Sequence, residues 1–75
     1  MDSRTLAQIS PGHRVKLVAI RGDRSLSRRL LALGLVVGNE VEVLHSRKGD
    51  VIVGRGGNRL ALGHDIAEQV VVEEL

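Results

Sequence analysis

Glycine-containing turns cut this chain into apolar runs that are short enough for brief strands and little else. The turn signals lie at Pro11-Gly12, Gly38-Asn39, Lys48-Gly49-Asp50 and Gly56-Gly57-Asn58. Glycine accepts the positive φ that tight turns require, and proline presets one backbone angle. The runs between the turns alternate apolar with polar residues or are rich in β-branched residues, as strands are. Strands are therefore predicted at 15–20, 40–44, 51–53, 59–62 and 70–72.

The length of the chain limits how these strands can be assembled. With 75 residues there is room for one domain, predicted to comprise residues 1–75. Short strands joined by glycine-rich turns favour a small closed barrel. Closure also removes the exposed sheet edges that so small a chain could not easily cover. The expected fold is mainly β, a small barrel of about five strands.

One segment follows a helical pattern instead. Leu26, Leu30 and Leu33 recur at the spacing of one helix face, and Leu31 widens that face. Because a helix this short is not stable alone in water, it must dock its leucines. The helix is inserted after the first predicted strand, where it would plug or cap one end of the barrel.

The ends of this helix carry their own signals. Ser25 is placed to act as the N-cap, its hydroxyl accepting from a free backbone N–H. Gly34 is the natural left-handed stop, and Leu35 would fold back onto Leu30 or Leu31. One further helical turn is expected at 63–68, before the last strand.

Composition excludes several classes of protein. Without cysteine there is no disulfide, thiolate metal cluster or thiol nucleophile. Without aromatic residues there is no stacking platform for unpaired bases and no groove for proline-rich peptides. The net charge of +2 is weak for a nucleic-acid binder. The longest nearly apolar run, 30–38, is far shorter than the roughly 20 residues of a membrane span, and no secretory signal follows Met1.

The sequence offers little support for catalysis. No serine is linked to one of the three histidines and an acid at a recognisable spacing. The glycine-rich stretch 54–58 lacks the pattern of a phosphate-binding loop and is better explained as a hairpin turn. We therefore expect a protein that is not an enzyme and has no catalytic residues.

Two groups of polar residues are candidate binding sites. His64, Asp65 and Glu68 could converge on one helical turn and bind a divalent ion weakly, although solvated polar residues around a turn are the simpler explanation. The second group lies on the exposed side of the predicted helix and comprises Arg24, Arg28 and Arg29. It is a solvated helix face or a docking face, since arginine is enriched at interfaces.

Charge along the chain favours the docking interpretation of the arginines. Residues 1–30 carry a balance of +5 and residues 31–75 a balance of −3. Ordinary surface variation would also produce such an asymmetry. A basic face that meets an acidic partner is the sharper hypothesis.

A set of residues in a particular order links this chain to a known family. The set comprises Pro11-Gly12, Val15, Val18, the run 28–35, Gly38, Val41, Val43, Leu60-Ala61-Leu62, Ala67 and 70–73. In this order and spacing the chain resembles the FeoA family, the small cytosolic component of bacterial ferrous iron uptake. The likeness extends from about Leu6 to Glu73, and its most specific part is 28–38.

The resemblance implies a fold and a role. The fold is an SH3-like β-barrel with a helical insertion after the first core strand and one helical turn before the last. The role is that of a cytoplasmic, non-catalytic protein that binds and modulates a FeoB-type membrane permease through its cytosolic GTPase domain. Arg24, Arg28 and Arg29 would then be the partner-binding residues. No nucleic acid, membrane insertion or certain cofactor is implied, and self-association fits so small a core.

The chain also departs from the family pattern, and a second function is compatible with the residues. Many members have Pro-Gly at Val37-Gly38, Gly-Asp-Pro in a longer segment near Lys48-Gly49-Asp50, and Leu-Arg at Leu62-Gly63. The same module forms the C-terminal domain of DtxR-like iron-dependent repressors. The alternative function is therefore a metal-responsive regulatory module that binds iron or zinc directly through His64, Asp65 and Glu68.

Overall fold

The computed structural model describes residues 4–75, so the first residues, where no secretory signal was expected, lie outside the described part. Six strands form one antiparallel sheet in the order β1-β6-β2-β3-β4-β5. They are β1 (Arg4–Thr5), β2 (Arg14–Ile20), β3 (Glu40–Arg47), β4 (Asp50–Arg55), β5 (Asn58–Leu62) and β6 (Val70–Glu74). All five predicted strands are confirmed, and β1 is an addition too short for the sequence pattern to indicate.

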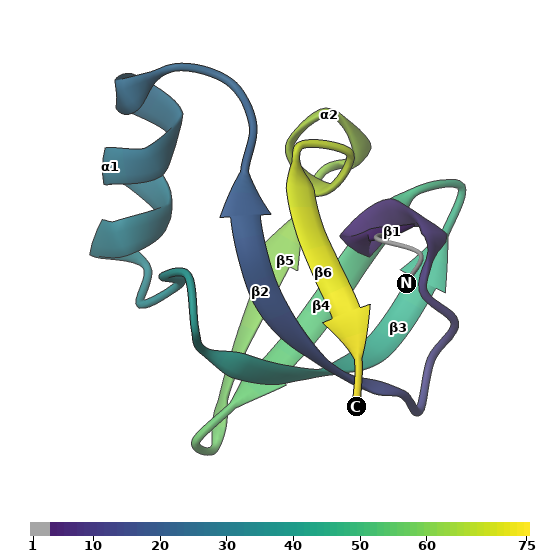
Figure 1. Ribbon diagram of the computed structural model, residues 1–75. Helices are drawn as coiled ribbons and strands as arrows, with labels where there is room; N and C mark the ends of the chain where they lie inside the picture. The colour runs from purple at the N-terminus through teal and green to yellow at the C-terminus, as the bar shows by residue number, and fades with distance from the viewer. Residues whose placement is uncertain (1–3) are drawn as a thin grey trace.

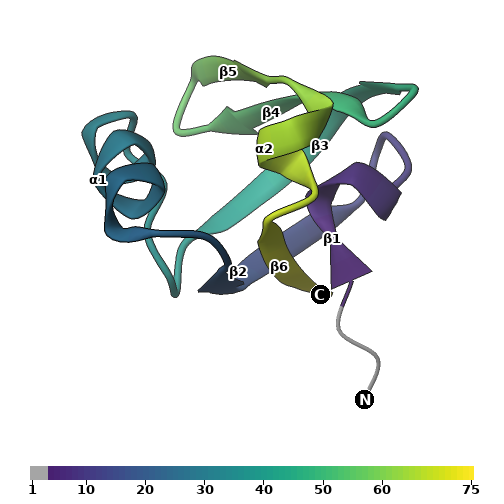
Figure 2. The same cartoon turned by 90° about the horizontal axis from the view of Figure 1, so that it is seen from above.

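The sheet curls into a barrel-like shape without closing. Strand β3 links the two halves, because its first residues pair with β2 and the remainder pairs with β4 (Figures 1 and 2). The edge strands β1 and β5 each pair with one neighbour and not with each other. The SH3-like, mainly β class is confirmed, but the expectation of full closure is wrong, because the edge strands β1 and β5 do not pair.

Apolar residues from both halves of the sheet meet in one core. Buried and exposed residues alternate along the strands, as in β4, where Val51 and Val53 are 1% exposed and flank half-buried Ile52. The core also receives Leu6 from the 3-10 helix η1 (Leu6–Gln8). Within residues 4–75 no polar side chain is buried. This core therefore depends on apolar packing alone.

Helix α1 (Arg24–Ala32) begins and ends at specific residues. The side chain of Asp23 accepts a hydrogen bond from the Leu26 N–H at 3.0 Å, so Asp23 and not Ser25 is the N-cap. At the other end Gly34, with a φ of 89°, turns the chain. The N–H of Leu35 then donates to the Leu30 carbonyl at 2.8 Å, as predicted from the glycine stop. Ser25 is already inside the first turn, which is why it cannot cap it.

The two helices occupy different sides of the curved sheet. Helix α1 stands along its open side, beside β2 and β5, whereas α2 (His64–Ala67) lies over one end (Figures 1 and 2). The expectation that α1 covers a barrel end is therefore wrong. The sheet stops short of closing, and the leucines of α1 fill the side that is left. No helix among the described residues is long and apolar enough to cross a membrane.

Candidate partner-binding surface on helix α1

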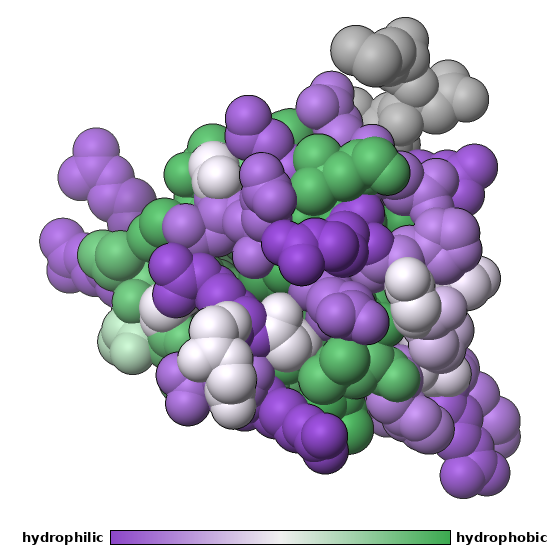
Figure 3. Space-filling view, turned by 90° about the horizontal axis from the view of Figure 1, so that it is seen from below, coloured by the Kyte–Doolittle hydropathy of each residue, from purple (hydrophilic) through white to green (hydrophobic). Residues whose placement is uncertain are grey.

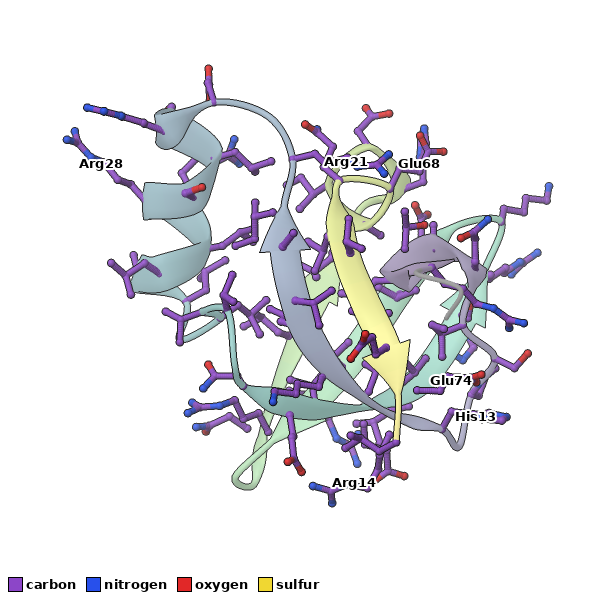
Figure 4. The ribbon with its side chains drawn as sticks, in the orientation of Figure 1. His13, Arg14, Arg21, Arg28, Glu68 and Glu74 are labelled. Carbon is purple, nitrogen blue, oxygen red and sulfur yellow. The ribbon has the colours of Figure 1, made fainter. Side chains whose placement is uncertain are left out.

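The outward face of α1 carries the three arginines that the sequence singled out. Arg24, Arg28 and Arg29 are all exposed. Figure 4 shows Arg28 pointing away from the sheet into solvent. Since Leu26 and Leu30 are 8% and 1% exposed on the opposite side, the amphipathic reading of the helix is confirmed for these two leucines. The arginines are free to meet another molecule.

The α1 arginines differ from two other basic residues of the N-terminal half. Arg4 lies 3.8 Å from Glu74, and Arg14 lies 3.4 Å from Glu40, both across strand pairs. No salt bridge of the described residues involves an arginine of α1, Lys16 or Arg21. The basic excess of residues 1–30 is therefore partly matched within the fold, and three of its five unmatched residues lie on the helix.

Apolar residues accompany the arginines at the C-terminal end of the helix. Leu31 is 59% exposed, Leu33 is 52% exposed, and Val37 in the following loop is 57% exposed. Figure 3, which views the molecule from the end where α1 finishes, shows apolar surface on the α1 side among polar groups. The exposed α1 face is defined here as these three residues together with the three arginines.

The exposure of Leu31 and Leu33 corrects the sequence prediction that both belong to the core-facing stripe. Leu33 is the C-cap, beyond the last helical turn, so the 3.6-residue period no longer places it. Leu35, 2% exposed, is turned inward by the glycine stop and takes the core position instead. Gly34 could have indicated the exposure of Leu33 in the sequence, because a helix that stops at this glycine ends before Leu33 can continue the apolar face.

A small crevice separates the end of α1 from the β4–β5 hairpin. Its volume is ≈ 40 Å³, and it is lined by Leu33, Leu35, Leu60 and arginines of the hairpin. The Arg55 guanidinium lies over Gly34, since a Cβ built there would be 3.5 Å from it. A positive charge at this point favours the carbonyl end of the helix. The crevice is too small for an organic ligand but could accept one apolar side chain from a protein.

The predicted metal residues form a different arrangement on α2. His64 Nε2 lies 2.9 Å from Asp65 Oδ1, and His64 Nδ1 lies 3.4 Å from Asp50 Oδ1. The Asp50 carboxylate also accepts a hydrogen bond from the backbone N–H of His64 at 2.7 Å. It provides a partner for this free N–H at the start of α2, because the N-cap residue, Gly63, has no side chain that could do so. The involvement of Asp50 is invisible in the sequence, because 14 residues separate it from His64.

Glu68 takes no part in the ion pairs of His64. It is the C-cap of α2, and Arg21 is beside it because the Arg21 N–H donates to the carbonyl of Gln69 at 2.7 Å (Figure 4). Within residues 4–75 no group of three or more His, Asp or Glu side chains is arranged to hold a metal ion. The structure thus brings together His64 and Asp65 of the predicted set and pairs them with Asp50.

The structure is therefore an open barrel-like β domain with an exposed helix face that is basic and apolar. The chain belongs to the FeoA domain family, whose sequence model matches residues 4–74. A protein of Methanocaldococcus jannaschii named Fe(2+) transport protein A is 28% identical over 69 residues, which cover 92% of this chain and 84% of that protein.

Solved structures agree with this family assignment. A crystal structure of an iron uptake regulatory protein (FeoA) is 31% identical, with a TM-score of 0.88 and all of both chains covered. A manganese-dependent transcriptional repressor superposes with a TM-score of 0.90 over 100% of this chain at 22% identity. This chain corresponds to 42% of that repressor, and the likeness concerns the fold alone.

Proposed function

We propose that this chain is a non-catalytic accessory protein of ferrous iron uptake. Its partner is the cytosolic GTPase domain of a FeoB-type membrane permease, and its role is to bind and modulate that permease from the cytoplasm. Membership of the FeoA domain family and the likeness to a protein named for Fe(2+) transport support the iron-uptake setting.

The single observation that carries the binding function is the exposed α1 face. Three arginines without salt bridges in the described fold are followed, at the C-terminal end of the helix, by apolar side chains that are more than half exposed. Arginine and large apolar side chains are typical of the residues that dominate binding energy. Arginine also pairs well with carboxylates, so the surface fits an acidic partner with an apolar centre.

An amide NMR titration of the labelled protein with the purified GTPase domain tests the proposal. We expect saturable shifts centred on 24–37, because direct contact changes the environment of those amides. The β3–β4 hairpin, which lies on the opposite side of the molecule (Figure 1), should remain unshifted. A flat titration over the same concentrations contradicts direct binding to this domain.

Charge reversal locates the contact. The double variant Arg28→Glu with Arg29→Glu should weaken binding at least about tenfold, because it places negative charge against an acidic partner. Arg47→Glu with Lys48→Glu is the matched control, since it reverses another adjacent basic pair, on the β3–β4 hairpin. Equal losses in the two variants would indicate general electrostatic attraction, and the contact on α1 would be refuted.

Direct binding of iron or zinc through His64, Asp65 and Glu68 stays a separate prediction. The observation that bears on it is the approach of two carboxylates to His64, one on either ring nitrogen. Calorimetry with ferrous iron and with zinc decides the matter. Binding heat that disappears in His64→Ala supports the metal-responsive function. The absence of site-specific heat in the natural chain contradicts that function.

A further inference from the structure

The outer face of strands β3, β4 and β5 contains exposed apolar and charged residues that have no part in the function proposed above. A β-bulge in β3 falls between Val43 and His45, so Leu44 is an extra residue in the pairing with β4. A bulge re-aims the side chain beside it. Here Leu44 is directed outward over Gly54, and a Cβ built on that glycine would come within 2.9 Å of the leucine. Leu44 remains 37% exposed.

The strand register places the neighbours of Leu44 in two rows across this face. One row contains Glu42, Gly54 and Arg59, which are successive cross-strand partners. The other contains His45, Ile52 and Ala61. Leu44, His45, Ile52 and Arg59 together line a shallow depression of ≈ 460 Å³. The face thus combines a small apolar centre with Glu42 on one side and Arg59 on the other. Arg47 and Asp50 form the next outward row, and Arg14 on β2 is the cross-strand partner of Glu42.

The two charged residues have no partners within the fold. Neither Glu42 nor Arg59 makes a salt bridge with any residue in the range 4–75. They lie on either side of β4, so roughly two strand spacings, or about 10 Å, separate their backbones. A surface with charges of both signs on either side of β4 is not suited to a strongly acidic or strongly basic partner.

We propose that this face binds a second copy of the chain, packed face to face with its two-fold axis parallel to β4. Such an axis exchanges the strands on either side of β4. It therefore brings Glu42 of one copy onto Arg59 of the other, and the same pair forms again on the far side. Interfaces of two-fold dimers have this reciprocity.

The same operation matches the apolar side chains. By the strand pairing, His45 is brought over Ala61 of the second copy, and the two Ile52 side chains meet at the axis. Leu44 lies beside the axis, over Gly54. Large-over-small packing lets the two sheets approach to the roughly 10 Å at which stacked sheets pack. The pairing of Glu42 with Arg59 therefore specifies one register of the two sheets.

Dimerisation on this face and binding through α1 use different residues, although Arg59 and Leu33 line the same small crevice. The exposed α1 face lies on the open side of the sheet, and the outer surface of β3–β5 is the convex side of the curl. A dimer would present two copies of the α1 face at once. Failure of either proposal therefore leaves the other intact, and separate experiments test them.

Sedimentation equilibrium of the full chain, from about 1 μM to about 1 mM, measures the association. We expect a reversible monomer–dimer equilibrium starting from the 8.1 kDa chain. Glu42→Arg and Arg59→Glu should each raise the Kd at least about tenfold, because each opposes like charges twice in the symmetric pair. The double variant restores the opposite charges and should return the Kd to within about threefold of the natural chain.

Arg21→Glu is the matched control, because it changes the same charge at an exposed residue that belongs to neither proposed surface, and it should leave the Kd unchanged. All the substituted residues are on the surface, and an amide spectrum of each variant confirms that it is folded. A monomer at every concentration overturns the proposal. So does a dimer that is insensitive to both reversals, or one that the double variant does not restore, since each excludes the Glu42–Arg59 pairing.

Discussion

Helix α1 and the sheet are attached to the molecule in different ways. Every strand of the sheet is hydrogen-bonded along at least one neighbour, and β2, β3, β4 and β6 along two. Helix α1 shares no ladder with any strand, and it is held by its buried leucines and by the residues at its two ends. The difference indicates that the sheet is the rigid scaffold, whereas the helix packs against it and presents an exposed surface.

Truncation of the scaffold core should have the largest effect. Leu17 in β2 is fully buried between the halves of the sheet. Leu17→Ala should lower the free energy of unfolding by about 3 kcal/mol, because paired strands cannot collapse into the cavity. Urea denaturation followed by circular dichroism measures the change. A loss below about 1 kcal/mol would show that the sheet is no more rigid than the helix.

Substitutions at two adjacent leucines of α1 distinguish the residue that packs in the core from the residue that is exposed on the outer face. Leu30→Ala should cost about 2 kcal/mol, less than the same change in the sheet, because the helix can shift toward the cavity. Leu31→Ala, a matched truncation at an exposed position, should change stability by no more than about 0.5 kcal/mol. The same urea measurement applies. Equal costs at the two positions would contradict the placement of Leu31 on the outer side.

The packing of α1 against the sheet depends on the backbone angle φ of Gly34, where the helix ends. Gly34 has a φ of 89°, which an L side chain rarely adopts, although there is space for a Cβ. Gly34→Ala should therefore lower stability by about 1 kcal/mol through backbone strain. Gly63→Ala is the control, because Gly63 has ordinary backbone angles and open space around it. If the control is equally destabilised, strain is not the cause.

The smallest expected effect lies in a turn of the scaffold. Lys48 is the non-glycine residue with positive φ in residues 4–75, and with Gly49 it forms the β3–β4 turn. Asn-Gly is preferred in such turns, so Lys48→Asn should raise stability by about 0.5 kcal/mol. Lys48→Val should lower it by about 1 kcal/mol, since β-branched residues resist this angle. Thermal melts of the pair decide, and the opposite order would contradict the strained angle.

Local patterns were enough to predict most of the elements. Glycine turns and the alternation of β-branched residues located the five longer strands, because turn angles and strand faces are properties of neighbouring residues. The stop at Gly34 and the inward turn of Leu35 were predicted for the same reason. Strand β1 was not predicted, because two residues are too few to show an alternating pattern and its partner strand β6 is far along the chain.

The surface was harder to predict, since burial depends on where the elements end and what lies beside them. The basic residues of α1 were identified from charge spacing, whereas the exposure of Leu31 and Leu33 was not. The helix cap is Asp23 and not Ser25 because two polar residues two positions apart can both accept, and the direction of the chain that enters from β2 selects one. Asp50 joined His64 only because the β3–β4 turn is folded against α2.

By itself the sequence determined the class of fold, the positions of the strands and the helix, and the family, since these depend on short-range periodicity and on residues in a fixed order. The tertiary structure decided that the sheet stays open, that α1 fills its side and that apolar residues remain on the outer face of the helix. It also decided that a bulge places Leu44 over Gly54. These outcomes depend on contacts between residues that only the completed sheet brings together.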